Sequence, residues 1–353
     1  PSPSQRRGVL SPPHRSGEGP GVGRRVAVPL IAAGACLIIL IWRSFGPRAT
    51  PVADLLGVLT LVVSFSAPIT LGALGGTFSE RSGVVNIAIE GMMLNGAFFG
   101  ALAAALGHNL WLGLLVAPLA GAVLALVHGV LSITFQVDQI ISGTVLNILA
   151  FGVTSYLNTL IFPSGSSTAR SSYAGTVPGL SVHVGPSTYS FGLISLVAIA
   201  LVFVAQYVLF KTTWGLRTRA TGENPRAADT AGIDVYVVRY VNVLLSGLLA
   251  GFGGAYFSLQ ALGHFEPGMT VGEGFIALAA MIFGNWTPFG AWRAALLFGF
   301  ASAMNSELQN WYDQVAWLQT LTSMLPYVVT LVVLAGWVGR SRPPAAVGVP
   351  YVK

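Results

Sequence analysis

Apolar runs separated by short polar segments extend along almost the whole chain. The first covers residues 26–42, and further runs follow at 55–76, 84–106, 110–135, 139–162, 190–210, 240–262, 274–285, 289–305 and 318–338. A helix of about 20 apolar residues is long enough to cross the hydrocarbon core of a bilayer. The pattern therefore predicts an all-α, polytopic membrane protein with about ten transmembrane helices. The run at 274–285 is short for a full span, which predicts a broken or re-entrant helix.

The ends of the chain differ from this apolar region. Residues 1–25 contain Arg, Pro and Gly without apolar periodicity, which predicts a disordered cytoplasmic tail. Residues 26–54 are expected to form an N-terminal anchor span and its loop. A secretory signal is the alternative, but the run exceeds a typical signal core and no Ala-x-Ala site follows it. Residues 55–340 would be the main transmembrane domain, with a cytoplasmic segment at 211–239, and residues 341–353 a second cytoplasmic tail.

Composition leaves little room for a separate soluble domain. Of the 353 residues 54% are apolar and 8% are charged, against about 25% charged residues in soluble proteins. If the N-terminus is cytoplasmic, all basic residues except Arg43, Arg48 and Arg170 lie on the cytoplasmic side. Basic residues are retained on that side of membrane proteins, so both termini are expected in the cytoplasm. The net charge of +6 then reflects topology and not binding of nucleic acid.

Sequence motifs of enzymes are missing. Neither Lys211 nor Lys353 follows a glycine, so the chain has no G-x-x-x-x-G-K-[ST] phosphate loop. H-E-x-x-H and G-x-S-x-G are absent, and the five His residues have no metal-ligand spacing. The single Cys36 excludes an internal disulfide and a cluster of Cys ligands. We therefore expect no catalytic residue, no metal site and no cofactor, and ATP hydrolysis would belong to a partner subunit.

A few polar residues interrupt the apolar runs and are candidates for a solute path. An ionisable group inside a bilayer is costly unless it faces protein or a watery cavity, so it indicates a route for a polar solute. Asn86 and Glu90 are four residues apart and would share one face of a helix that begins near residue 84. The predicted translocation path consists of Asn86, Glu90, Asn95, Ser142, Thr144, Asn147, Gln260 and Glu273.

These candidates also have a structural interpretation. Glu90 could accept hydrogen bonds from helix ends at a break and touch no solute. Ser142, Thr144 and Asn147 could form hydrogen bonds between helices. The sequence alone leaves both interpretations open.

Small residues recur at four-residue spacing in two of the runs. Such ridges let helix backbones touch in lipid, where packing replaces the hydrophobic driving force. The ridges are Gly247, Gly251 and Ala255; Ser246, Ala250 and Gly254; and Gly96, Gly100 and Ala104. They predict close contacts between helices.

Two polar segments lie between the runs. Residues 163–189 are rich in Ser, Gly, Thr and Pro, which is typical of an external loop. In the cytoplasmic segment 211–239, Asn224 and Pro225 form an N-cap and first-turn pair, and Gly232 is a stop signal. This pattern predicts one short helix between two spans.

Four segments resemble one protein family. They are LGALGGTFSERSGVVNIAIEGMMLNGAFFG (71–100), TGENPRAADTAGI (221–233), FIALAAMIFGNWTPFGAW (275–292) and MLPYVVTLVVLAGWVGRSRPPAAVGVPY (324–351). Together they resemble permease subunits of bacterial ATP-binding-cassette (ABC) importers for nucleosides, within the wider ribose, simple-sugar and branched-chain amino-acid permease family. The resemblance extends over residues 55–351, so the domain at 55–340 would be a permease domain.

The resemblance implies half of a helical pore in the bacterial plasma membrane that works by alternating access. Its implied partners are a second permease chain, cytoplasmic ATP-binding subunits and an external substrate-binding lipoprotein. Similar cytoplasmic segments act as coupling helices that dock on the ATPase, and this role is transferred to Gly222, Glu223, Asn224, Pro225, Ala228 and Gly232. An inverted repeat would relate the runs within 55–162 to those within 240–338, with glycine-rich turns before residues 84 and 274 in corresponding places.

Two alternatives remain open at this point. A simple-sugar or branched-chain amino-acid permease would share the same architecture. An ion-coupled carrier with Glu90 as its proton site would need no ATPase and would transport when expressed alone.

Overall fold

The computed structural model describes residues 51–162, 176–184, 187–311, 324, 328 and 342–353. All of them belong to one compact unit of the chain, Ala49–Leu331 together with Gly339–Lys353. The tail predicted at 1–25, the anchor run at 26–42 and nearly all of the run at 318–338 lie outside the described residues.

The described part of the chain is mainly helical. Its long helices are α2 (Pro51–Arg81), α3 (Ile89–Gly107), α4 (Leu110–Gly129), α5 (Gln139–Ile161), α6 (Leu193–Lys211), α9 (Val235–Ala255) and α11 (Pro288–Trp311). Short π-helical turns, η1 (Val130–Thr134) and η2 (Tyr256–Ala261), extend α4 and α9. Among the described residues, 6 helices are long and apolar enough to cross a membrane, namely α2, α3, α4 with η1, α5, α6, and α9 with η2. The predicted polytopic, all-α class is confirmed, whereas the total of about ten spans stays a prediction.

The short run at 274–285 forms a short helix. This helix, α10 (Glu273–Phe283), has 11 residues. At 1.5 Å per residue it is about 16 Å long, roughly half the thickness of a hydrocarbon core. It follows a non-helical loop at 262–272, so the prediction of a broken helix at this place is confirmed.

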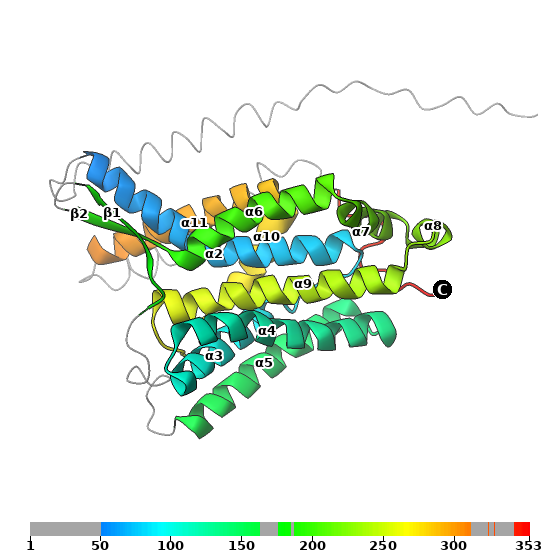
Figure 1. The fold of residues 1–353 in the computed structure, drawn as a ribbon, viewed down its shortest axis with the longest axis horizontal. Helices are drawn as coiled ribbons and strands as arrows, with labels where there is room; N and C mark the ends of the chain where they lie inside the picture. Colours follow the sequence, from blue (N-terminus) through cyan, green and yellow to red (C-terminus); the bar gives the residue numbers. More distant parts are fainter. Residues whose placement is uncertain (1–50, 163–175, 185–186, 312–323, 325–327, 329–341) are drawn as a thin grey trace, which may run out of the picture. The chain divides into compact units, whose positions relative to one another are not determined.

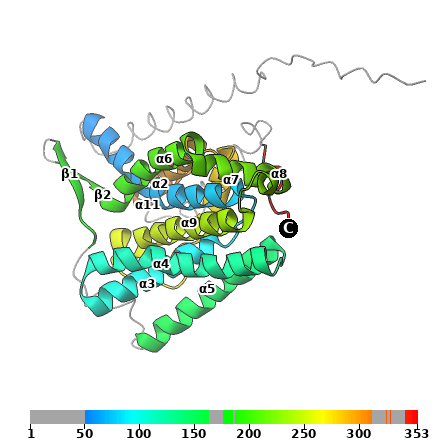
Figure 2. The same cartoon turned by 45° about the vertical axis from the view of Figure 1, so that its right-hand side comes forward.

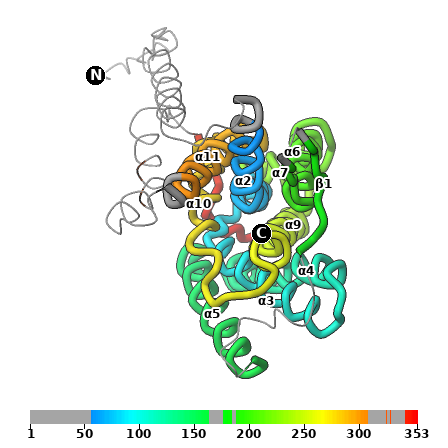
Figure 3. The backbone as a smooth tube through the Cα atoms, turned by 90° about the vertical axis from the view of Figure 1, so that its left-hand side faces the viewer, coloured from blue at the N-terminus to red at the C-terminus, as the bar shows by residue number. Residues whose placement is uncertain are grey.

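Helix α9 lies between two groups of helices (Figure 1, Figure 2). It packs against α3 and α4 on one side and against α2 on the other, and α2 also packs against α10 and α11. Figure 3 shows the same arrangement along the helix axes.

Small residues bring α3, α4 and α9 into backbone contact. A Cβ atom at Gly96 would lie 2.2 Å from the carbonyl oxygen of Gly251. A Cβ atom at Gly251 would lie 2.4 Å from the carbonyl oxygen of Ala117. Since any side chain would collide with backbone at these positions, the predicted close packing through small residues is confirmed.

Different structures lie at the two ends of the helices (Figure 1). A hairpin of β1 (Gly179–Val184) and β2 (Ser187–Gly192) lies at one end, with antiparallel pairing. The short helices α7 (Thr213–Glu223) and α8 (Pro225–Thr230) lie at the other end, together with the C-terminus. We refer to these as the hairpin end and the α8 end. The hairpin occupies the first positions of the run predicted at 190–210, so α6 starts only after it.

The segment at 211–239 differs from the prediction of one short helix, because it contains both α7 and α8 and the start of α9. The hydroxyl of Thr212 accepts a hydrogen bond from the Gly215 N–H at 3.3 Å and so caps α7. Glycine disfavours helices, but only glycine fits at position 222 of α7, because a Cβ atom there would lie 2.2 Å from the Arg81 carbonyl oxygen. Tertiary packing therefore decides which residue α7 can have at this position.

Candidate functional site

The chain between α2 and α3 is not helical, and other helices pair its backbone. We call residues 82–88 the first break. The Val85 N–H donates to Gln139 Oε1 at 2.7 Å, and the Val85 carbonyl lies 2.9 Å from His128 Nε2. The Ile87 carbonyl accepts from Asn147 Nδ2 at 2.9 Å. Non-helical backbone is tolerated at membrane depth only where such partners satisfy it, so these side chains make the break possible.

Asn86 and Asn147 cap the start of α3 from two sides. Asn86 is fully buried, and its Oδ1 accepts from the Ala88 N–H at 3.1 Å while its Nδ2 donates to Ser246 Oγ at 2.8 Å. Asn147 Oδ1 accepts from the Gly91 N–H at 2.8 Å. The prediction that Asn86 and Glu90 share a helix face is wrong, because α3 begins at Ile89 and Asn86 lies in the break.

Glu90 lies in the first turn of α3 and caps the start of α10. Its Oε1 accepts from Thr270 Oγ1 at 2.5 Å and from the Gly272 N–H at 3.0 Å. Its Oε2 accepts from the Gly274 N–H at 2.7 Å. A carboxylate is an acceptor of this kind, and the N-terminus of a helix favours negative charge. The structure therefore contains the hydrogen bonds that the structural interpretation of Glu90 requires, from the start of a helix at a break.

The second break is the loop at 262–272, which leads into α10. A Cβ atom at Gly274 would lie 2.5 Å from the Glu90 Cα, so the two helix starts touch through backbone. Glu273 is the first residue of α10, and its Oε2 is buried with no hydrogen-bond partner among the described residues.

The other end of α10 is held by the end of α2, in contacts that the sequence did not reveal. Trp286 Nε1 donates to Glu80 Oε2 at 2.6 Å. Arg81 donates from Nε to the Trp286 carbonyl at 2.8 Å and from Nη2 to the Asn285 carbonyl at 3.3 Å. Adjacent acidic and basic residues at the end of an apolar run were the available signal, but the basic one was interpreted only as a marker of topology.

The remaining path candidates are spread over the molecule. Gln260 Oε1 accepts from the Ile194 N–H at 2.8 Å, so Gln260 caps the start of α6. Ser142 Oγ lies 3.1 Å from Nδ1 of His128, and the exposed Thr144 donates to a carbonyl of its own helix. Asn95 is half-buried on α3. The structure thus brings Asn86, Glu90, Asn147 and Glu273 together around the breaks and leaves the path role of every candidate a prediction.

His128 is a site residue that sequence reasoning missed. It is fully buried on α4 and joins the first break to Ser142 of α5. A histidine inside an apolar run was the signal, since ionisable residues in membrane helices face protein or water. The sequence offers no second metal ligand beside it, so spacing alone does not mark it as a site residue. In the described residues no group of three or more His, Cys, Asp or Glu side chains could hold a metal ion.

The short helix predicted after Asn224 exists as α8, and its coupling role stays a prediction. Asn224 Oδ1 accepts from the Ala227 N–H at 3.1 Å, and Pro225 occupies the first helical position. Gly232 ends the segment with φ of +81°, a conformation that favours glycine. The predicted cap, first turn and stop are confirmed.

Not every coupling candidate is available to a partner. Ala228 is 3% exposed and packs against Val235 and Tyr351. Gly222 is also buried, and its carbonyl accepts from the Ala346 N–H at 2.9 Å. Glu223 is exposed, and its Oε2 accepts from the Ala345 N–H at 3.3 Å. The outward face of α8 is instead formed by the exposed residues Arg226, Ala227 and Thr230.

Comparisons with known proteins cover most of the chain. A family model described as branched-chain amino acid transport system / permease component matches residues 58–334. The guanosine ABC transporter permease protein NupQ of Bacillus subtilis is 41% identical over 317 residues, which are 85% of this chain and 99% of the relative. The nucleoside ABC transporter permease protein NupC of Lactococcus lactis is 39% identical over 310 residues, or 84% and 96%. The putative glucose ABC transporter permease protein TsgC13 of Haloferax volcanii is 36% identical over 264 residues, or 72% and 78%. No solved structure matches the chain.

Proposed function

Since this chain belongs to the family of permease components of branched-chain amino acid transport systems, we propose that it is the permease subunit of an ABC importer for nucleosides. One observation is the main support for nucleosides as the substrate class. The 41% identity to a guanosine permease extends over 99% of that relative. The 36% identity to a putative glucose permease supports a simple sugar as the second candidate substrate.

The proposed assembly needs partners that supply energy and substrate. We propose a second permease chain beside this one, ATP-binding subunits on the cytoplasmic side and an external substrate-binding lipoprotein. The α8 end faces the cytoplasm of a bacterial cell and the hairpin end faces outward, with both termini inside. The excess of basic residues in the segments assigned to the cytoplasm supports this orientation.

The two breaks are proposed to lie beside the path. Helix α10 spans about half of the bilayer core, and Arg81 and Glu80 hold Trp286, in the turn that follows α10, at the α8 end. Its start, capped by Glu90, is then near the middle of the membrane. Glu90 acts there as a positioning residue that fixes the start of α10. Movement of α10 relative to α3 would open and close the path, as expected for half-helices that meet at the midplane of a transporter.

Transport by the reconstituted complex tests the function. The chain is purified with the ATPase, the second permease and the lipoprotein encoded by neighbouring reading frames, and the complex is placed in liposomes. We expect ATP-dependent uptake of labelled guanosine, with little uptake of labelled glucose or leucine. Uptake by the chain alone under a proton gradient would instead support the ion-coupled carrier.

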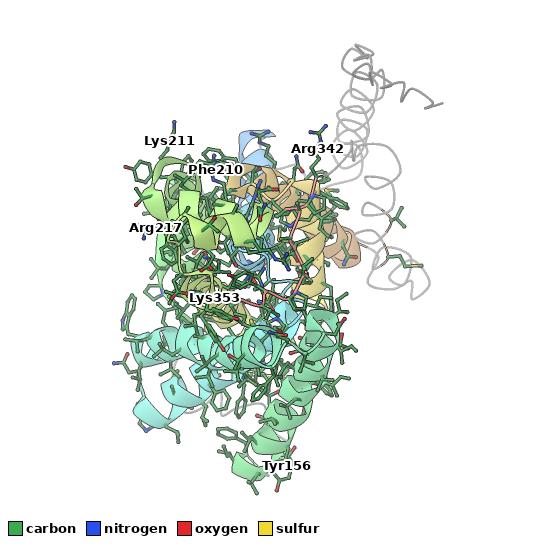
Figure 4. The ribbon with its side chains drawn as sticks, turned by 90° about the vertical axis from the view of Figure 1, so that its right-hand side faces the viewer. Tyr156, Phe210, Lys211, Arg217, Arg342 and Lys353 are labelled. Carbon is green, nitrogen blue, oxygen red and sulfur yellow. The ribbon has the colours of Figure 1, made fainter. Side chains whose placement is uncertain are left out.

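The outward face of α8 offers a separate test of docking. Arg226→Glu reverses an exposed charge on α8, and we expect it to weaken binding of the ATP-binding subunit. Arg217→Glu is the matched control, because Arg217 is exposed on α7 (Figure 4). The amount of ATP-binding subunit that stays bound to the purified permease is measured for both variants. Equal retention in the two variants would refute docking through α8.

A further inference from the structure

The last residues of the chain form an ordered, non-helical segment outside the range that the family model matches. We call residues 342–353 the C-terminal strap. Its first and last residues, Arg342 and Lys353, are labelled in Figure 4. The Arg342 N–H donates to Asn285 Oδ1 at 3.0 Å, and Lys353 Nζ lies 3.4 Å from Asp229 Oδ1. The strap therefore reaches from the end of α10 to α8.

One side of the strap supports α8. Tyr351 is 6% exposed and forms a small core with Ala228 of α8 and Val235 of α9. Its ring centroid lies 5.6 Å from that of Tyr236, whose hydroxyl donates to the Tyr351 carbonyl at 3.3 Å. Since α8 has only 6 residues, a helix of this length depends on such packing for its stability.

The other side of the strap contacts the first break. The Gly348 N–H donates to the Gly83 carbonyl at 3.1 Å. Gly348 has φ of +78° and Gly83 has φ of +96°, so both residues adopt conformations that favour glycine. A Cβ atom at Gly83 would lie 3.3 Å from the Ala346 carbonyl oxygen, which places the strap against the break.

A buried arginine, Arg239, makes displacement of the strap energetically costly. Arg239 is 2% exposed on α9, and its Nη1 donates to the Val349 carbonyl of the strap at 3.2 Å. Its Nε and Nη2 have no hydrogen-bond partner among the described residues. A buried charge without full pairing is costly, so losing the strap carbonyl would leave the guanidinium worse paired still.

We propose that the C-terminal strap is the mechanical link that carries a displacement of α8 to the breaks beside α3 and α10. The inference rests on the proposed function, in which an ATPase moves α8. The strap contacts α8 through Tyr351 and Lys353, the first break through Gly348, and the turn that follows α10 through the bond from Arg342 to Asn285. A shift of α8 therefore pulls on the chain at both interrupted helices at once.

The test compares uptake with ATP hydrolysis in the reconstituted complex. Tyr351→Ala loosens the α8 side of the strap, and Gly348→Ala strains its contact with the first break. For each we expect nucleoside uptake per ATP hydrolysed to fall about tenfold, within the usual range of coupling between sites, while hydrolysis persists. Val352→Ala is the matched control, because that strap side chain is 63% exposed. Unchanged uptake per ATP in assembled Tyr351→Ala and Gly348→Ala complexes would overturn the proposal.

A crosslink keeps the proposal testable if those variants fail to assemble. Asp229→Cys with Lys353→Cys, in a Cys36→Ser background, allows a short crosslinker to join the strap to α8. We expect the crosslinked complex to keep its uptake of nucleoside, because a crosslink does not hinder the strap and α8 if they move together. Loss of transport on crosslinking would show that strap and α8 must separate, which contradicts the link. Absence of ATP-dependent uptake by the unmodified complex would refute the proposed function itself, and that result is distinct from either strap outcome.

Discussion

The starts of α3 and α10 resemble each other in sequence but are held in different ways. Each helix follows a break and has Glu followed by Gly in its first turn, and another helix caps the N–H of that glycine. Gly91 donates to the amide of Asn147, whereas Gly274 donates to the carboxylate of Glu90. The capping group is neutral at α3 and acidic at α10.

Packing differs even more than capping. Twelve residues of α3 are buried, among them Gly96 and Gly100 against neighbouring backbones, whereas only four residues of α10 are buried. Helix α3 is thus held along its length by close packing, and α10 depends more on the contacts at its two ends. Burial thus covers 12 of the 19 residues of α3 and 4 of the 11 residues of α10.

The largest effect is expected where α3 is packed most closely. Gly96→Val places a branched side chain where a Cβ atom alone would lie 2.2 Å from the Gly251 carbonyl oxygen. Overpacking of this kind costs about 3 kcal/mol or more, so we expect loss of folded protein on size-exclusion chromatography in detergent. Gly152→Val on α5 is the matched control, because no atom lies within 4 Å of a Cβ there. A normal elution profile for Gly96→Val would contradict the packing argument.

A smaller effect is expected from the acidic cap of α10. Both carboxyl oxygens of Glu90 accept hydrogen bonds, so the NH2 group in Glu90→Gln must face at least one donor. We expect a loss of about 2 kcal/mol, seen as a lower melting temperature of the purified complex. Glu273→Gln is the control, because Glu273 Oε2 has no partner among the described residues and a smaller loss is expected.

Uptake by the same Glu90→Gln complex separates capping from contact with solute. Lower melting temperature with normal uptake per assembled complex would assign Glu90 to capping alone. Unchanged melting temperature with lost uptake would show that the cap contributes little and that Glu90 acts on the solute.

Substitution of the neutral cap of α3, Asn147, should lower thermal stability less than substitution of Glu90. Asn147 both accepts from the Gly91 N–H and donates to the Ile87 carbonyl. Asn147→Asp keeps the first bond and replaces the second with repulsion between oxygens, at a cost of about 1 to 2 kcal/mol. Thermal melting checks this value, with Thr144→Ala on the exposed side of α5 as control. A stabilised Asn147→Asp variant would mean that negative charge suits the start of α3 as well as that of α10.

The smallest effect concerns a single hydroxyl. Thr270→Val removes the donor that lies 2.5 Å from Glu90 Oε1 and keeps the size of the side chain. Because two backbone N–H groups still hold Glu90, we expect a loss of about 1 kcal/mol in thermal stability. Thr159→Val, which removes an exposed hydroxyl bonded within its own helix, should leave the melting temperature unchanged. A loss in Thr270→Val as large as that in Glu90→Gln would mean that the hydroxyl carries most of the cap.

The sequence predicted much of the fold and only part of the site. Apolar run length marked six membrane-length helices and the short α10, because burial in lipid requires a continuous apolar stretch. The ridge of Gly247 and Gly251 and the cap at Asn224 were also recognisable, since both depend on neighbours within one helix. Tertiary contacts, in contrast, pair the backbone of the break before Ile89 and leave no room for a side chain at Gly222 of α7.

What the sequence by itself determined was therefore the membrane class of the protein, its small-residue packing ridges and the short helix α8, because each follows from local spacing. What only the tertiary structure decided was which polar residue pairs with which backbone group. Asn147 meets Gly91, Glu90 meets Gly274, and Gly348 meets Gly83 across long stretches of chain. Each pair satisfies a backbone group that has no partner within its own segment, and sequence spacing does not specify which distant residue supplies that partner.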